Sequence, residues 1–234
     1  MRCSLLLVPL LLGGCVSATK PATGDGPPRR QFTIERLAKG DIDTVVEVHQ
    51  RRALRHLETL MVKLYKRNPV QLHRHPGATI EQRRRELFAD GRVPDYPEFA
   101  GRRGIDCIRL ALDPAYPGDR VVALVAGMKG MLMDAYGNRT EFWFYSQLDP
   151  QKLYNSARNI EIAVWKLSNS SDGNGTPLLL SNSLPGEPAN LSYERLFGKL
   201  ISLQDTIAEI IADSSNRVIK KVIQNMATAV FLPV

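Results

Sequence analysis

The sequence predicts an all-α protein that folds as a single-domain helical bundle. Apolar residues recur at spacings of three and four along most of the chain, which is the period of an amphipathic helix. No two segments show the strict alternation that is typical of paired, half-buried strands. With 234 residues, 44% of them hydrophobic, the chain has enough interior for a stable core without disulfide bonds.

The first half of the chain contains three segments with helical patterns. A long helix is expected from Asp41 to Asn68, because an apolar stripe runs through this segment and Asn68-Pro69 ends it. Thr79-Ile80-Glu81-Gln82 has the pattern of a capping box, which predicts a short basic helix as far as Phe88. A second short helix is expected over residues 104–112.

Residues 119–137 are apolar on nearly every side of a helix. Such a helix is either central in a core or spans a membrane. Asp119 and Asp134 bracket only fourteen residues and Lys129 interrupts them, which is too short a run to span a bilayer. We therefore expect a buried central helix at about 119–137, with close neighbours at Gly127 and Gly130.

Two helices are expected in the last third of the chain. Asp149-Pro150 is a cap followed by proline at the first helical position, and an apolar stripe continues to residue 167. A long C-terminal helix follows two loops. Its apolar stripe shifts at residues 214–216 and then continues to Met226, so the helix is expected to bend or break at the shift.

Residues 1–14 have the features of a signal peptide. Arg2 provides the positive charge, and Leu5 to Leu12 form a short apolar run that is too short to span a bilayer. The run ends in Leu12-Gly13-Gly14-Cys15, which resembles the lipobox of bacterial lipoproteins. This resemblance implies that the signal is cut before Cys15, and that Cys15 carries fatty chains of the palmitate type.

The chain is accordingly divided into three parts. Residues 1–14 are the signal peptide, residues 15–30 are a lipidated flexible tether rich in Pro, Gly, Ala and Thr, and residues 31–234 are the α-helical domain. Several acyl chains attached to one residue anchor a protein stably to a membrane. Val16 stands where an aspartate favours retention at the inner membrane, so we expect the periplasmic face of the outer membrane.

A second resemblance covers most of the mature chain. Residues 101–106, 118–128, 149–167 and 222–234 resemble segments of proteobacterial exported lipoproteins of unknown function. The resemblance implies localisation in the cell envelope and brings no catalytic residue with it.

No motif assigns an enzymatic reaction to the chain. There is no nucleophile elbow, phosphate-binding loop, dinucleotide fingerprint or zinc-protease pattern. His49 and His56 share a helix face, and His73 and His75 lie in a loop, but neither spacing specifies a metal site. Cys107, the one thiol left in the mature chain, is expected to be buried and inert. We assign no catalytic residue, no metal and no cofactor.

Positive charge is concentrated in one half of the sequence. Residues 29–109 contain 18 Lys and Arg against 11 Asp and Glu, whereas residues 110–234 contain 11 against 12. This charge predicts a basic contact face that binds an acidic envelope protein or anionic lipid headgroups. Nucleic acid is disfavoured as a partner, because a lipid-anchored envelope protein seldom meets it. Solvated helix faces with local ion pairs are the alternative. The residues assigned to this face are Arg83, Arg84, Arg85, Arg102 and Arg103.

A polar face accompanies the apolar stripe of the helix after Asp149. Tyr154, Arg158, Glu161 and Trp165 follow one another at helical spacings and are the candidate lining of a ligand pocket. The alternative is a structural ion pair between Arg158 and Glu161 that fixes helix packing.

These observations favour a lipid-anchored periplasmic protein that acts as a non-enzymatic binding or scaffolding module. Two alternatives remain open. The first is a small-molecule or lipid-binding carrier with a pocket along Tyr154, Arg158 and Trp165. The second is an enzyme whose site assembles in the fold from dispersed histidines and carboxylates.

Overall fold

The computed structural model describes residues 40–143, 148–181, 183–184 and 186–234. Within these residues the chain forms seven α-helices and no strand, which confirms the predicted all-α class. The predicted signal peptide (1–14), Cys15 and the tether (15–30) lie outside the described residues.

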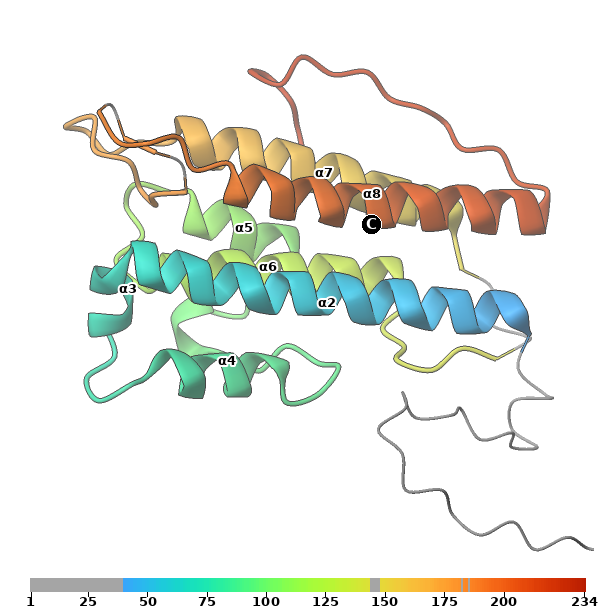
Figure 1. Ribbon diagram of the computed structural model, residues 1–234, viewed down its shortest axis with the longest axis horizontal. Helices are drawn as coiled ribbons and strands as arrows, with labels where there is room; N and C mark the ends of the chain where they lie inside the picture. The colour runs from blue at the N-terminus through green and yellow to red at the C-terminus, as the bar shows by residue number, and fades with distance from the viewer. Residues whose placement is uncertain (1–39, 144–147, 182, 185) are drawn as a thin grey trace, which may run out of the picture. The chain divides into compact units, whose positions relative to one another are not determined.

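The helices form a layered bundle. In Figure 1, α7 and α8 lie side by side, α2 runs along α6, and α4 lies on the side of α2 away from α7. The short helix α5 packs against α6. The bounds are α2 Asp41–Arg67, α3 Pro69–His73, α4 Ile80–Phe88, α5 Ile105–Ala111, α6 Arg120–Ala135, α7 Pro150–Asn169 and α8 Ser192–Ser215, with a 3₁₀ helix at Pro97–Phe99.

Side-chain caps start three of these helices, and those at Thr79 and Asp149 were predicted from the sequence. Thr79 and Gln82 form the reciprocal capping box of α4. The Asp119 carboxylate accepts hydrogen bonds from the backbone N–H groups of Val121 and Val122 at the start of α6. Asp149 accepts one from Gln151 N–H at the start of α7, where Pro150 is the first helical residue. Each cap satisfies amides that have no partner within the helix.

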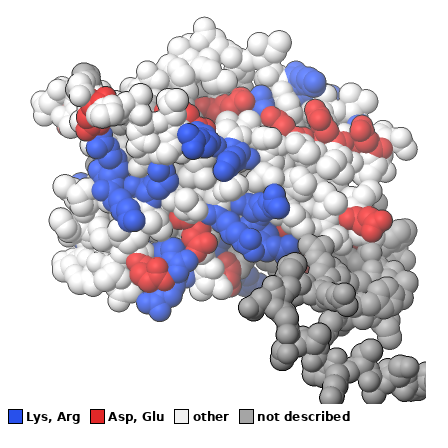
Figure 2. Space-filling view, in the orientation of Figure 1, with Lys and Arg blue, Asp and Glu red and all other residues white. Residues whose placement is uncertain are grey.

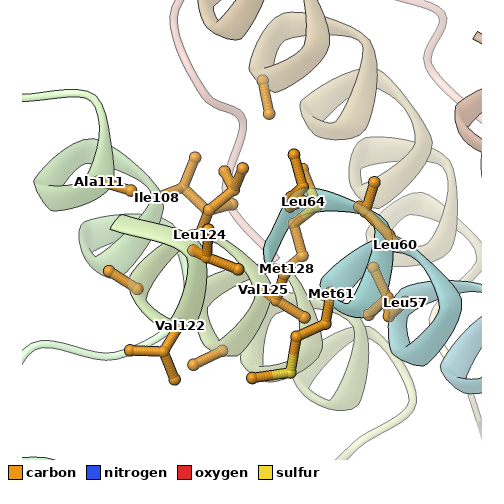
Figure 3. Close-up of a cluster of buried hydrophobic side chains, with 14 of the residues drawn as sticks. Leu57, Leu60, Met61, Leu64, Ile108, Ala111, Val122, Leu124, Val125 and Met128 are labelled. Atoms are coloured by element: carbon orange, nitrogen blue, oxygen red, sulfur yellow. The ribbon is translucent and has the colours of Figure 1, made fainter. Parts of the chain in front are cut away.

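Helix α6 is the centre of the core, as its sequence predicts. All of its residues except Gly130 and Asp134 are buried. Figure 3 shows side chains of α2, α5 and α6 meeting in one cluster, in which Leu60, Ile108 and Leu124 are fully buried. No helix in the described ranges is both long and apolar enough to cross a membrane.

Close packing of α5 on α6 depends on Gly127. A Cβ atom at this position would lie 2.7 Å from the backbone nitrogen of Ile108 and 2.8 Å from the carbonyl oxygen of Gly104. Both atoms belong to backbone and cannot rotate away, so only glycine fits. A Cβ atom at Gly130 would likewise lie close to the backbone, 3.2 Å from the nitrogen of Gly104.

Lys129 is a charged side chain in the middle of α6, and it is fully buried. Its Nζ donates to the carbonyl oxygens of Leu87 (2.6 Å), Asp90 (2.8 Å) and Arg92 (2.6 Å). These three bonds satisfy the ammonium group and fix the turn after α4 to the central helix. Burial lowers the pKa of Lys129 to about 8.

Helix α8 ends at the predicted shift in its stripe. Asn216 takes a left-handed conformation (φ 51°), a common helix ending, and Arg217 N–H bonds back to the Ala212 carbonyl. The second stripe, to Met226, is therefore not helical: residues 217–225 have neither helix nor turn. We call residues 217–234 the C-terminal arm. Figure 1 shows it leaving α8 and returning over α7.

We expect Gly127→Ala to lower the free energy of unfolding by about 1–3 kcal/mol, because the added methyl group overpacks the α5–α6 contact. Chemical denaturation followed by circular dichroism measures the change. The matched control is Gly198→Ala on α8, where a Cβ would meet no atom within 4 Å. That variant should gain about 0.5–1 kcal/mol. Equal effects from the two substitutions would contradict the packing argument.

Lys129 makes the stability depend on pH. Its pKa is about 8 in the folded chain and about 10.4 in an unfolded one, so between these values the unfolded chain binds more protons. The contribution of Lys129 to stability therefore rises as pH increases from 8 to 10. We expect the unfolding free energy of the wild type, minus that of Lys129→Met, to increase over this range. A difference that stays constant with pH would show that the lysine does not titrate there.

Candidate functional site

A groove of about 720 Å³ runs between α2 and α8, and cationic side chains line it. We call it the α2/α8 groove. Figure 2 shows Lys and Arg side chains gathered over both helices on this face, with uncharged surface between the two groups. The lining residues are Arg52, Arg55, His56, Arg195, Gly198, Lys199, Ser202 and Leu203.

Helix geometry explains why the cations converge. On α2, Arg52 immediately precedes the buried Ala53, and His56 precedes the buried Leu57. On α8, Arg195 and Lys199 precede the buried Leu196 and Leu200 in the same way. The cations therefore flank the two apolar stripes that hold α2 and α8 in contact. Burying the stripes brings the charges together from segments about 140 residues apart in sequence.

The positive charge of the α2/α8 groove is not neutralised within the described part of the chain. Arg52, Arg55, Arg195 and Lys199 form no ion pair there. Glu58, an acid on α2 close to the groove residues in sequence, pairs instead with Arg84 of α4. Burial lowers the pKa of His56, and the nearby charges of Lys199 and Arg52 lower it further. Guanidinium and ammonium donors with no acid between them are suited to bind phosphate or carboxylate groups.

A second polar cluster is buried where α2, α4 and the start of α6 meet. Tyr65 O–H donates to the Asp119 carboxylate at 2.5 Å. His75 Nε2 lies 3.6 Å from a carboxylate oxygen of Asp119 and 3.6 Å from one of Glu98. Arg83 lies within 3.4 Å of Glu98 and within 3.8 Å of Asp119. We call these five residues the Asp119 cluster.

The electrostatics of the Asp119 cluster indicate a structural role. Burial raises the pKa of Asp119, while the hydrogen bond from Tyr65, the amide of Val122 and the charge of Arg83 oppose that rise. Burial also raises the pKa of Tyr65, so its hydroxyl is a poor acid. The cluster contains no serine, threonine or cysteine as a nucleophile. Its groups pair with one another, although the buried Arg83 Nε has no hydrogen-bond partner among the described residues, and they join α2, α4 and α6.

Neither site was predicted from the sequence. The five residues of the Asp119 cluster come from five separate segments, and no spacing in the sequence connects them. The α2/α8 groove was missed because its four cations are split between both halves of the chain. The excess of positive charge before residue 110 signalled only the α2 side.

Part of the predicted basic contact face is not at the surface. Arg83 was assigned to this face, but it is only 7% exposed and belongs to the Asp119 cluster, because its position on α4 faces α2 and α6. That assignment is wrong. Arg84 is half-buried and pairs with Glu58 and Glu81. The remaining members, Arg85, Arg102 and Arg103, are exposed.

The four residues predicted to line a ligand pocket do not share one. Arg158 pairs with Glu161 (3.1 Å) and, across to α8, with Asp205 (2.6 Å). Arg158 and Glu161 lie beside a pocket of about 240 Å³ under the C-terminal arm. Trp165 lines a different pocket of about 400 Å³ next to α5. Tyr154 packs under the Arg158 guanidinium and accepts a hydrogen bond from Val222 N–H.

The remaining candidate residues have local partners. His49 bonds to the carbonyl of Val45 one turn earlier, and His73 is exposed. Cys107 is buried, and burial raises the pKa of its thiol to about 11. No three His, Cys, Asp or Glu residues of the described chain are arranged to hold a metal ion.

Comparison with known proteins adds no family to these observations. No family model, no curated protein and no solved structure matches the chain.

We expect Asp119→Ala to lower the free energy of unfolding by about 3–5 kcal/mol, because it removes the cap of α6 and leaves Arg83 buried beside fewer carboxylates. The matched control is Asp149→Ala, which removes an exposed cap from α7 and should lower it by about 1 kcal/mol. Denaturation of both variants measures the difference. Similar losses would mean that Asp119 acts as a cap alone.

Proposed function

We propose that this protein is a lipid-anchored, non-enzymatic binding module on the periplasmic face of the outer membrane. In this proposal the α2/α8 groove binds the anionic headgroups of membrane lipids. The observation that supports it is the convergence of Arg52, Arg55, Arg195 and Lys199 on one groove, where no acid of the described residues pairs with them.

The pattern Leu12-Gly13-Gly14-Cys15 supports the anchored part of the proposal. A domain tethered through Cys15 encounters headgroups at a high effective concentration, because the tether confines it to the membrane surface. Each cation close to an anionic surface contributes about 1 kcal/mol. Four of them supply an affinity that is useful only for a domain already held nearby.

Confinement also favours headgroups over an acidic protein as the occupant of the groove. A groove of about 720 Å³ with point charges from two helices has room for a phosphate group. Gly198, one of its lining residues, leaves space there, since nothing lies within 4 Å of the position of its absent Cβ. An acidic protein would have to diffuse to a site that headgroups already surround.

The anchor is tested by Cys15→Ser. We expect the wild type to incorporate radiolabelled palmitate and to fractionate with membranes, because the thiol is the attachment atom. The variant should lose the label. A variant that stays labelled would show that the lipid is attached elsewhere, and an unlabelled wild type would remove the anchor from the proposal.

The groove is tested with a chain of residues 16–234, which keeps every described helix and lacks the lipid. We expect it to sediment with vesicles containing phosphatidylglycerol and not with phosphatidylcholine vesicles. Removing two groove cations in Arg195→Ala/Lys199→Ala should weaken binding about thirtyfold, which corresponds to about 2 kcal/mol. Binding should also fall with added salt.

The matched control is Arg85→Ala/Arg103→Ala, which removes the same charge from exposed positions outside the groove. It should change binding by less than threefold. If both double variants lost affinity equally, net charge and not the groove would account for binding. If neither did, headgroups would not be the ligand.

A further inference from the structure

Polar side chains of α7 hold the C-terminal arm in place by hydrogen bonds to its backbone. Gln151 makes two hydrogen bonds to the backbone of Lys220, donating to its carbonyl at 3.1 Å and accepting from its N–H at 2.7 Å. Near the other end, Asn159 makes the same pair of bonds to Leu232, at 2.8 and 2.7 Å. Asn155 adds a bond to the Pro233 carbonyl. The arm is therefore positioned at both ends.

Only one edge of the extended part of the arm uses its backbone groups. Lys220 and Val222, two residues apart, both bond to side chains of α7. In an extended chain the N–H and C=O groups of alternate residues point to opposite edges. The backbone groups of Ile219, Lys221 and Ile223 accordingly lie on the other edge, and they make no hydrogen bond within the described residues.

The side chains beside this free edge are apolar and cationic. Val218 is 90% exposed and Ile223 is 99% exposed. Valine and isoleucine are among the residues most often buried in proteins. Arg217, Lys220 and Lys221 are also exposed and form no ion pair in the described chain. Between Arg217 and Ile223 there is no acidic residue.

We propose that residues 217–223 bind an extended acidic segment of another protein by adding it as a strand along the free edge. Backbone hydrogen bonds to Ile219, Lys221 and Ile223 would give affinity, and acidic side chains would pair with the cations of the arm. Val218 and Ile223 would be covered by apolar residues of the same segment. This interaction is independent of the α2/α8 groove, which lies between α2 and α8.

The free edge argues against two other occupants. A bilayer would cover Val218 and Ile223, but hydrocarbon offers no partner to the unpaired backbone groups, each of which costs several kcal/mol there. A second copy would place three cations of one arm opposite three of the other, and like charges directly opposed on paired strands are destabilising. An acidic segment satisfies both the backbone and the charge.

The test uses full-length protein in a non-ionic detergent and a fluorescent seven-residue peptide of alternating Glu and Val. Binding is measured by fluorescence anisotropy. We compare Lys221→Pro with Lys221→Ala, because both remove the charge and only proline removes the N–H on the free edge. Lys221 N–H is unbonded and its side chain exposed, so both variants should fold and melt as the wild type does.

We expect Lys221→Ala to weaken binding about fivefold and Lys221→Pro to weaken it at least tenfold more. Methylating alternate amide nitrogens of the peptide should cause a similar loss, and a peptide of alternating Lys and Val should not bind. Equal affinities of the proline and alanine variants, or of the methylated and plain peptides, would overturn strand addition. Absence of binding to the Glu-Val peptide would overturn it as well.

The same preparation distinguishes the other occupants. Sedimentation velocity that shows a wild-type dimer lost in Lys221→Pro would identify a second copy as the occupant and overturn the proposal. Displacement of the peptide by phosphatidylglycerol vesicles from Arg195→Ala/Lys199→Ala, in which the groove is disabled, would identify the membrane. Neither result bears on the groove, so the two proposals fail separately.

Discussion

The burial of nearly every residue of α6 is the constraint on which the rest of the structure depends. A helix that is apolar on all sides has to be surrounded, and α2, α5 and α7 pack around it. Two buried polar groups then connect it to its surroundings. Asp119 satisfies the amides at the start, and Lys129 reaches three carbonyls of the segment after α4. The buried charges of this protein therefore hold the surrounding segments to its most apolar element.

Properties that depend on neighbours in sequence could be predicted, and the caps predicted at Thr79 and Asp149 were confirmed. A cap is recognised from a few consecutive residues, and burial of α6 from sixteen. The role of Arg83 could not be predicted. In sequence it stands in a run of three arginines, and only the packing of α4 on α2 decides which of them turns inward. Neighbouring residues on one turn of a helix lie in different environments, and a run of like charges does not show which of its members is buried.

The sites were harder to predict than the fold because both are formed by contacts between distant segments. The α2/α8 groove exists because two amphipathic helices bury their stripes against each other and place flanking cations on the same side. The free edge of the arm exists because α8 ends at Asn216, whereas the apolar pattern continues to Met226. The left-handed turn at Asn216 ends the helix before the second stripe, and Val218 and Val222 of that stripe are exposed.

Some charged side chains of this protein have partners within the fold, and others do not. We interpret the first group as structural and the second as available for binding. In and around α4, Arg83 and Arg84 have carboxylate partners, and the one buried lysine has three carbonyls. In the groove, four cations share one space and pair with no acid of the described residues, so their mutual repulsion opposes the α2–α8 contact that Leu57 and Leu200 stabilise. An anion that bound there would remove this repulsion, and a ligand that binds only the folded state stabilises it. The position where the fold tolerates unpaired like charges is thus the position where a ligand has the most to contribute.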